Sequence, residues 1–406
     1  MAGMVIVGAG EAGARAALAL RDNGNAGPVT LIGTEKHAPY ERPPLTKATM
    51  TSPGEARLPV IGNPARFAEV GIDMRLDATV SSIDRAAKAV LLGDGTSLPY
   101  EKLLLATGAV PRRLTLPGSA AALYLRTFDD AQALRAQLQS GRKIAVIGGG
   151  FIGLEFAASA RSLGCEVAVV EFAPRILLRG VPEPVAALIA ARHIAEGVAL
   201  WTNTAMERIE SADGKHTIVM KDGRRLTVDC ILAGIGAAPD VALAQAAGLE
   251  IDNGIKVDAQ LRTCDPDIYA AGDCCSFPHP LFDGRRIRLE ARRNAMDQAA
   301  LAAANMTGGT GEHVAVPWFW SDQYDVHLQI AGIADGATTH VSRDLGPDAR
   351  LIFHLAEHGR LRAASGAGPI GKIAKEVKMA DLLIARRAHP DPVGLADPGV
   401  RLKSFI

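Results

Sequence analysis

The chain of 406 residues is poor in cysteine, has no surplus of charge and lacks long apolar runs. Its five cysteines, of which Cys165 is the first, are too few and too scattered for a disulfide framework or a metal site such as zinc. The 44 basic and 44 acidic residues cancel, which excludes nucleic-acid binding through bulk basicity and leaves room only for a local basic patch. No stretch approaches the ~20 apolar residues of a membrane span, and no signal peptide pattern opens the chain. We expect a soluble, unprocessed, cytoplasmic protein without a membrane or nucleic-acid partner.

Glycine is abundant, with 42 residues, and two clusters of it share one pattern. In each, an apolar strand pattern (residues 4–7 and 143–147) runs into G-x-G-x-x-G, a helical run and a second apolar strand (residues 29–32 and 167–170). This is the context that a dinucleotide-binding motif requires: a tight turn, close approach to a pyrophosphate, and close packing of helix on strand. We predict two β-α-β units whose nucleotide-binding positions are Gly8, Gly10, Ala12 and Gly13, and Gly148, Gly150, Ile152 and Gly153.

The acidic residue beyond the second strand differs between the two units. Glu171 directly follows Val170, where a carboxylate can accept hydrogen bonds from the adenosine ribose and would repel a 2′-phosphate. This favours NADH over NADPH, with Arg175 as the one nearby cation that could weaken the preference. In the first unit Gly33 takes the equivalent position, so Glu35 is the nearest acid. It is either a ribose ligand or an exposed loop residue.

Two further segments have the character of a nucleotide site but do not identify the ligand. An apolar strand pattern, residues 100–105, ends in Ala106, Thr107 and Gly108, and a later segment ends in Gly272 and Asp273. Small residues allow a ligand to approach the backbone, and an aspartate can accept a hydrogen bond from a ribityl hydroxyl.

A family resemblance identifies that ligand. The paired glycine motifs, the two segments above, P-Y-E-R-P-P-L-T-K (residues 39–47) and V-P-W-F-W-S-D-Q-Y (residues 316–324) resemble the FAD-dependent pyridine-nucleotide reductases of the glutathione-reductase-like class. Within it, the likeness is greatest to the NADH-dependent ferredoxin reductases of bacterial cytochrome P450 and Rieske oxygenase systems, and it covers essentially the whole chain. The resemblance implies an α/β fold with two Rossmann-like dinucleotide-binding domains, for FAD and NADH, plus a smaller C-terminal α/β domain. The implied boundaries are 1–113 and 237–313 for the FAD domain, 114–236 for the NADH domain and 314–406 for the C-terminal domain.

The resemblance also implies catalytic roles. It places Lys47 beside the isoalloxazine ring, where a cation could stabilise the reduced flavin, unless this is an ordinary surface lysine. It places Glu155 near the nicotinamide, although a first-turn glutamate also suits the helix dipole. Trp320 is expected against the flavin, with generic aromatic core as the alternative. The other implied cofactor ligands are Arg42, Val80, Arg126 and Gly236.

The lack of any cysteine before Cys165 predicts how electrons leave. Disulfide reductases of this class carry a cysteine pair beside the flavin, and cysteine-based oxidases and peroxidases carry one cysteine in the first domain. Here only Cys274 and Cys275 adjoin a flavin segment, and we interpret them as packing residues. A flavin accepts hydride and can release electrons singly. The implied activity is that of a ferredoxin–NAD(+) reductase, which uses FAD and NADH to reduce a 2Fe-2S ferredoxin that feeds a P450 or Rieske oxygenase.

Two alternatives stay open: a reductase for another acceptor, such as rubredoxin, a quinone or oxygen, and a flavin-bound signalling protein. Acceptor-dependent NADH oxidation separates them. An acidic ferredoxin would need a local basic face for docking. The candidate cations are Arg285, Arg286, Arg288, Arg292, Arg293, Lys372, Lys375 and Lys378, of which Arg292 and Arg293 depart from the family pattern.

Overall fold

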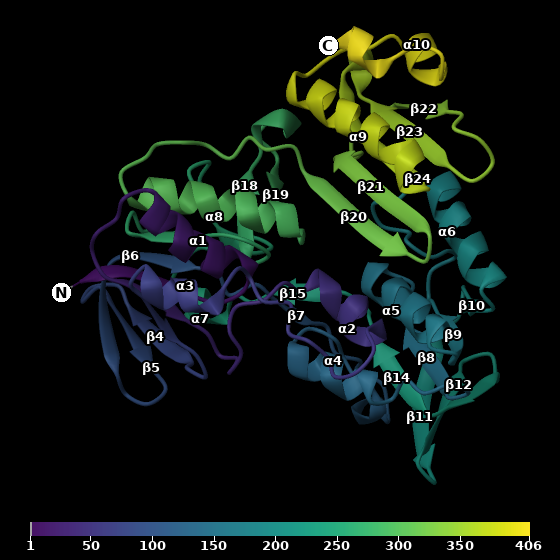
Figure 1. Cartoon of the computed structure of the whole chain (residues 1–406), viewed down its shortest axis with the longest axis horizontal. Helices are drawn as coiled ribbons and strands as arrows, with labels where there is room; N and C mark the ends of the chain where they lie inside the picture. The colour runs from purple at the N-terminus through teal and green to yellow at the C-terminus, as the bar shows by residue number, and fades with distance from the viewer. Residues whose placement is uncertain (1) are drawn as a thin grey trace. The chain divides into compact units, whose positions relative to one another are not determined.

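The computed structural model describes residues 2–406, which form two compact units (Figure 1). The first unit contains the described residues up to Arg42, Leu58–Val110 and Ala238–Pro317. The second contains Pro43–Arg57, Pro111–Ala237 and Trp318–Ile406. The crossings lie near the predicted boundaries at 113, 236 and 313, and the three domains stay a prediction. The second unit contains the segments expected for the NADH and C-terminal domains together with the short segment that carries Lys47.

A seven-stranded sheet forms the centre of the first unit. Its order is β3 (Ile72–Arg75), β2 (Val29–Ile32), β1 (Gly3–Val7), β6 (Ser97–Leu105), β5 (Ala89–Leu92) and β4 (Val80–Asp84), and β17 (Ile268–Ala270) pairs with the end of β6. Strands β3, β2, β1, β6 and β17 run parallel, whereas β5 and β4 continue the sheet antiparallel. Every residue of β1 is buried, as expected of a central parallel strand covered on both faces. The carboxyl ends of β1, β6 and β17 therefore meet at one edge.

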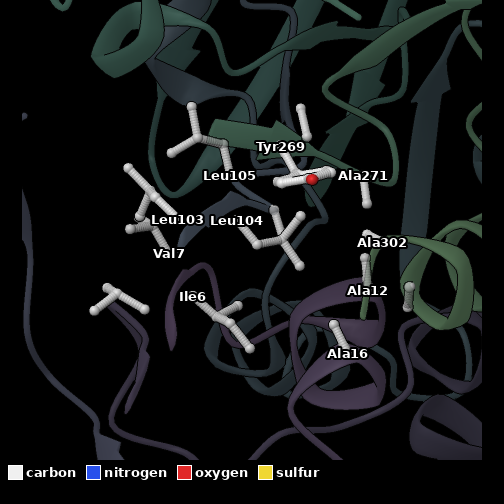
Figure 2. Close-up of a cluster of buried hydrophobic side chains, with 14 of the residues drawn as sticks. Ile6, Val7, Ala12, Ala16, Leu103, Leu104, Leu105, Tyr269, Ala271 and Ala302 are labelled. Carbon is white, nitrogen blue, oxygen red and sulfur yellow. The ribbon is translucent and has the colours of Figure 1, made fainter. Parts of the chain in front are cut away.

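Alanine-rich helices cover this sheet. Helices α1 (Glu11–Asp22) and α8 (Arg292–Met306) pack side by side, because their facing residues are mostly alanines that let the two backbones approach (Figure 1). Figure 2 shows Ala12 and Ala16 of α1 and Ala302 of α8 together with Ile6, Leu104 and Tyr269 of the sheet. The remaining elements of this unit are α3 (Pro64–Glu69), α7 (Ala242–Ala246), η3 (Pro280–Phe282) and a small sheet of β16 (Ile255–Lys256), β18 (Cys275–Pro278) and β19 (Arg286–Ile287).

The second unit contains a parallel sheet of four strands. Their order is β10 (Ala199–Trp201), β9 (Glu166–Val170), β8 (Lys143–Ile147) and β14 (Cys230–Ala233). The associated helices are η1 (Pro43–Thr46), α2 (Ala48–Thr51), η2 (Ser119–Ala121), α4 (Phe128–Arg135), α5 (Phe151–Ser162) and α6 (Glu183–Ala195). An antiparallel sheet follows, with the order β11 (Met206–Ala212), β12 (Lys215–Met220) and β13 (Arg225–Val228). The short strands β7 (Ala109–Pro111) and β15 (Ala237–Pro239) pair where the chain crosses between the units.

The C-terminal part of this unit is an antiparallel five-stranded sheet. Its order is β20 (Trp318–Gln323), β21 (Val326–Gly332), β24 (Leu361–Gly368), β23 (Arg350–Leu355) and β22 (Thr339–Arg343). Strand β24 is buried along its whole length because α9 (Ile370–Ala385) and α6 both pack against it. The chain ends with α10 (Pro392–Ala396) and η5 (Leu402–Phe405), and η4 (Glu357–Gly359) precedes β24.

The predicted repeat is confirmed element by element. Strands β2 and β8 coincide with the apolar runs at residues 29–32 and 143–147. The two helices begin at Glu11 and Phe151, so the last residues of each glycine motif form the first helical turn. Among residues 2–406, no helix combines the length and apolar character needed to span a bilayer.

Candidate active site

The loop between β1 and α1 has the shape that its glycines predict. Gly8 has a φ of +109°, and a Cβ there would lie 2.1 Å from the Ala106 carbonyl oxygen. A Cβ on Gly13 would lie 1.8 Å from the Gly8 carbonyl oxygen. In contrast, a Cβ on Gly10 would meet nothing within 4 Å, so the loop is open at its second glycine. No side chain caps the N-terminus of α1 at Gly10, which leaves backbone N–H groups available to a pyrophosphate.

The loop between β8 and α5 repeats this geometry. Gly148 has a φ of +101°, and a Cβ there would lie 2.5 Å from the Gly234 carbonyl oxygen. A Cβ on Gly153 would lie 2.3 Å from the Gly148 carbonyl oxygen. Gly150 again faces open space, since its nearest neighbour would be 3.9 Å away, and no side chain caps α5. Both units therefore fit a dinucleotide at the same place, where an uncapped helix begins.

This geometry separates the roles of two glycines in the second loop. We expect Gly150→Ala to change the free energy of unfolding by less than about 1 kcal/mol, because its Cβ enters open space, yet to weaken NADH binding at least about tenfold. Gly153→Ala should weaken binding and also cost about 2 kcal/mol or more of stability, because its Cβ overlaps the backbone. Urea unfolding and NADH titration measure both effects. Equal stability losses in the two variants would contradict the open second glycine.

The predicted flavin segments converge on the first loop. Ala106 already lies against Gly8, and Gly272, at a φ of +83°, would place a Cβ 3.1 Å from Ala12. The Gly272 amide donates to Gln298 Oε1 at 2.8 Å, and Thr107 Oγ1 donates to the Asp240 carbonyl at 2.6 Å. The structure thus brings residues 106–108 and 271–273 beside Gly8 and Ala12, at the edge where β1, β6 and β17 end. Val80 opens β4 and packs, partly buried, against the core of this unit.

Glu35 belongs to a cluster with two neighbours from the P-Y-E-R-P-P segment. Tyr40 donates to Glu35 Oε2 at 2.5 Å, and Arg42 donates to Glu35 Oε1 at 2.9 Å and to the Tyr40 hydroxyl at 3.0 Å. Burial works to lower the pKa of the Arg42 guanidinium, but Tyr40, Glu35 and Asp273 together raise it above its ordinary value. Glu35 is therefore part of an organised cluster rather than an isolated loop acid.

Glu171 is held at the second glycine loop by two backbone donors. The Gly149 amide donates to Oε2 at 2.6 Å, and the Ala173 amide donates to Oε1 at 2.7 Å. Arg175 instead donates to backbone carbonyls of its own loop, those of Ile176, Leu177, Leu178 and Val181. Its guanidinium thus bonds to its own loop rather than to the Glu171 carboxylate.

The charge of Glu171 should decide the choice of nucleotide. Glu171→Gln keeps the shape of the side chain and one of its two acceptor oxygens, but removes the charge that repels a 2′-phosphate. We expect the ratio of kcat/KM for NADH over NADPH to fall about tenfold, or about 1.4 kcal/mol. The matched control is Glu166→Gln at the start of the same strand, where the side chain is 63% exposed. An unchanged ratio in Glu171→Gln would remove this residue from the site.

Lys47 and Glu155 form a pair although 108 residues separate them in the sequence. Lys47 Nζ lies 2.6 Å from Glu155 Oε2, and the glutamate side chain is only 6% exposed. Thr46 donates to the same carboxylate oxygen at 2.5 Å, and Ser321 donates to the other at 2.6 Å. Lys47, which is 25% exposed, is thus paired with a nearly buried carboxylate in the first turn of α5, and the roles of both residues beside the cofactors stay predictions.

Side chains of α4 and α5 donate hydrogen bonds to the backbone of the segment that carries Lys47. Arg135 of α4 donates to the carbonyls of Thr49, Ser52 and Gly54 at 2.5, 2.5 and 2.6 Å. Ser159 of α5 donates to the Thr46 carbonyl at 2.6 Å. These bonds explain why residues 43–57 belong to the second unit. No local pattern marks Arg135, Thr46 or Ser159, so sequence reasoning missed them.

The remaining predicted residues have varied surroundings. Trp320 stacks on Trp318 with ring centroids 5.4 Å apart, while Phe319 between them packs on Phe151 of α5 at 4.3 Å.

Ile152, in the first turn of α5, is 46% exposed, as a ligand-facing residue would be. The Arg126 amide donates to Asp130 Oδ2 at 3.0 Å, just before α4. Gly236, at a φ of +104°, would place a Cβ 3.4 Å from the Arg179 guanidinium.

Several docking candidates already have acidic partners. Arg292 forms ion pairs with Glu41 and, at 3.4 Å, with Glu11. Other pairs are Arg288 with Glu290, Arg293 with Asp297, Lys372 with Asp348 and Lys378 with Asp381. These cations contribute less net positive charge than their number indicates. Lys375 is exposed on α9.

Four of the five cysteines pack in the interior of the protein. All five are free, and only Cys264 is exposed. Burial raises the pKa of the Cys230 thiol to about 11 and also raises those of Cys274 and Cys275. The adjacent pair Cys274 and Cys275 is fully buried, which agrees with a packing role.

Comparisons with known proteins agree with this geometry. The family model of the pyridine nucleotide-disulphide oxidoreductases matches residues 3–303, and the model described as reductase C-terminal matches residues 318–406. The chain is 44% identical to the ferredoxin–NAD(+) reductase component of the anthranilate 1,2-dioxygenase system of Burkholderia cepacia, over 99% of this chain and 98% of that protein. It is 42% identical to a rubredoxin–NAD(+) reductase of Pseudomonas putida, over 81% and 86%. The crystal structure of a covalent putidaredoxin reductase–putidaredoxin complex has a TM-score of 0.93 at 35% identity, covering 100% of this chain and 98% of that one.

Proposed function

Since the chain belongs to the pyridine nucleotide-disulphide oxidoreductase family, we propose that it is a ferredoxin–NAD(+) reductase. It takes hydride from NADH on FAD and passes electrons singly to a 2Fe-2S ferredoxin that feeds a cytochrome P450 or Rieske oxygenase. The names of two relatives support such partners. One relative is the ferredoxin–NAD(+) reductase component of a dioxygenase system, and another is a putidaredoxin reductase.

The observation that carries the proposal is the Lys47–Glu155 pair, in a part of the chain without a nearby cysteine in sequence. Its Nζ to Oε2 distance is 2.6 Å, and the glutamate side chain is only 6% exposed. No cysteine precedes Cys165, so the segments around Gly8 and Lys47 contain no thiol that could relay electrons. A flavoprotein of this family without a thiol relay must deliver electrons to an external acceptor.

Each group of residues has a task in this reaction. When bound, the flavin supplies two-electron acceptance and one-electron release. The open loops at Gly10 and Gly150 would hold the two pyrophosphates through backbone N–H groups. Glu171 would recognise the nicotinamide nucleotide through its adenosine ribose. Glu155 holds the Lys47 ammonium in place, and Lys47 would supply positive charge where reduction adds negative charge.

We place the reaction in the cytoplasm. The five free cysteines fit a reducing compartment, and NADH is available there.

A rubredoxin–NAD(+) reductase is the second candidate, because a relative at 42% identity carries that name. Rubredoxin accepts one electron at a single iron, so the hydride half of the reaction would be the same. The difference lies only in the docking surface of the acceptor.

Steady-state NADH oxidation with different acceptors tests the proposal. A 2Fe-2S ferredoxin should raise turnover at least about a hundredfold over air-saturated buffer, and rubredoxin should raise it less. Faster turnover with rubredoxin would favour the second candidate. Rapid peroxide formation without any carrier would contradict both.

A further inference from the structure

A buried series of side-chain hydrogen bonds leads from α6 to Glu155. His193 of α6 is fully buried, and its Nε2 lies 2.8 Å from Gln323 Oε1 at the end of β20. Gln323 Nε2 donates to Ser321 Oγ at 3.0 Å, and Ser321 Oγ donates to Glu155 Oε1 at 2.6 Å. Gln323 and Ser321 are 2% and 0% exposed. Such enclosed polar groups must pair with one another, because water cannot satisfy them.

Only one assignment of donors satisfies all three bonds. The Ser321 hydroxyl donates to the carboxylate, so its oxygen accepts from the Gln323 amide nitrogen. The amide oxygen then accepts, which requires a proton on His193 Nε2. The other ring nitrogen, Nδ1, lies 3.5 Å from the Tyr324 hydroxyl. Burial lowers the pKa of His193, so its imidazole is neutral at neutral pH.

All donors of this series are directed toward Glu155. The second carboxylate oxygen accepts from Thr46 at 2.5 Å and pairs with Lys47 at 2.6 Å. Three donors thus face the two oxygens, an arrangement that satisfies an ionised carboxylate and fixes its rotation.

Contacts around His193 hold that end of the series in place. Arg192, next to His193, donates to Asp325 Oδ1 at 2.7 Å and lies over the Tyr324 ring at 5.1 Å. The rings of His193 and Tyr324 meet edge to face at 5.1 Å. These contacts fix α6 against the β20–β21 turn, so the spacing between His193 and Gln323 is set by packing as well as by the hydrogen bond itself.

We propose that His193, Gln323 and Ser321 are positioning residues that hold the Glu155 carboxylate, and through it the Lys47 ammonium, in the orientation used for hydride transfer. The proposal rests on the proposed function, because it assigns the Lys47–Glu155 pair to that step. None of the three residues needs to touch the cofactor. Their effect depends on the direction of the hydrogen bonds, which gives the proposal a specific test.

Gln323→Glu changes the direction of the hydrogen bonds in this series but keeps the shape of the side chain. The new carboxylate can only accept, so it draws the Ser321 hydroxyl away from Glu155 and favours a doubly protonated His193. We expect hydride transfer, followed as anaerobic flavin bleaching by NADH, to slow about tenfold, as for one lost hydrogen bond to a charged group, with little change in the KM for NADH. Gln132→Glu, on the exposed face of α4, adds the same charge elsewhere in this unit and should leave the rate unchanged.

A nitrogen-15 NMR spectrum of the holoenzyme tests the direction without using activity. His193 should be neutral and protonated at Nε2 in the natural protein, and an imidazolium in Gln323→Glu. Ser321→Ala should also slow hydride transfer about tenfold, because it removes one donor from Glu155. A natural His193 protonated at Nδ1, or natural rates in both variants, would overturn the proposal. Failure of the proposed function has a different signature, since the natural protein would then either not be bleached by NADH or, once bleached, not be reoxidised by the ferredoxin.

Discussion

Replacing Lys47 with methionine is expected to slow flavin reduction by NADH about a hundredfold, while the protein keeps its FAD. Methionine retains the length and the apolar stem of lysine but removes the charge that pairs with Glu155 at 2.6 Å. Without it, no cation offsets the negative charge that reduction adds, and a nearly buried carboxylate is left unpaired. Anaerobic stopped-flow absorbance measures the rate, and Lys221→Met, at an exposed turn of the same unit, is the matched control.

A double variant separates the two consequences of losing Lys47. Adding Glu155→Gln to Lys47→Met removes the unpaired carboxylate, so we expect stability to recover by about 1–2 kcal/mol. The rate should stay low, because the missing positive charge is not restored. A single variant that reduces its flavin at the natural rate would exclude Lys47 from the reaction.

Arg343→Ala is expected to lower the free energy of unfolding by about 3–5 kcal/mol. The side chain is 3% exposed, and its Nε lies 3.2 Å from Glu376 Oε2 on α9. The guanidinium also donates to four carbonyls of the last segment of the chain, those of Leu395, Asp397, Pro398 and Val400. Its removal leaves Glu376 and these carbonyls without their donor.

Urea unfolding measures this effect, with exposed Arg401→Ala as the control. Because Arg343 serves only the C-terminal sheet and its surroundings, partial unfolding could precede the main transition. We therefore expect an earlier fluorescence change from the tryptophans of β20, at the opposite edge of the same sheet. Identical transitions in Arg343→Ala and Arg401→Ala would show that the buried arginine contributes no net stability.

The nucleotide loops could be predicted from sequence because their chemistry is local. A glycine with positive φ, a glycine facing open space and a glycine against a carbonyl follow each other within six residues, and both copies keep this order. The positions of Gly8, Gly10 and Gly13 therefore carried enough information by themselves. The flavin segments needed the family resemblance, since Asp273 and Ala106 have no local pattern that specifies a ligand.

The surroundings of Glu155 could not be predicted, because its partners are distant in the chain. Thr46 and Ser321 are 109 and 166 residues away, and only the packing of α5 against β20 and residues 43–57 brings them together. The same holds for His193 and Gln323, which are 130 residues apart. Arg292 illustrates the opposite error: a cation that looks available in the sequence is paired with two glutamates in the fold.

The most direct test of the account is an anaerobic double-mixing experiment on the FAD-loaded protein. One equivalent of NADH should bleach the flavin, and oxidised 2Fe-2S ferredoxin added next should restore its colour while two ferredoxin molecules are reduced per flavin. NADPH at the same concentration should bleach it far more slowly. A flavin that NADH leaves oxidised, or a reduced flavin that ferredoxin cannot reoxidise, would contradict the account.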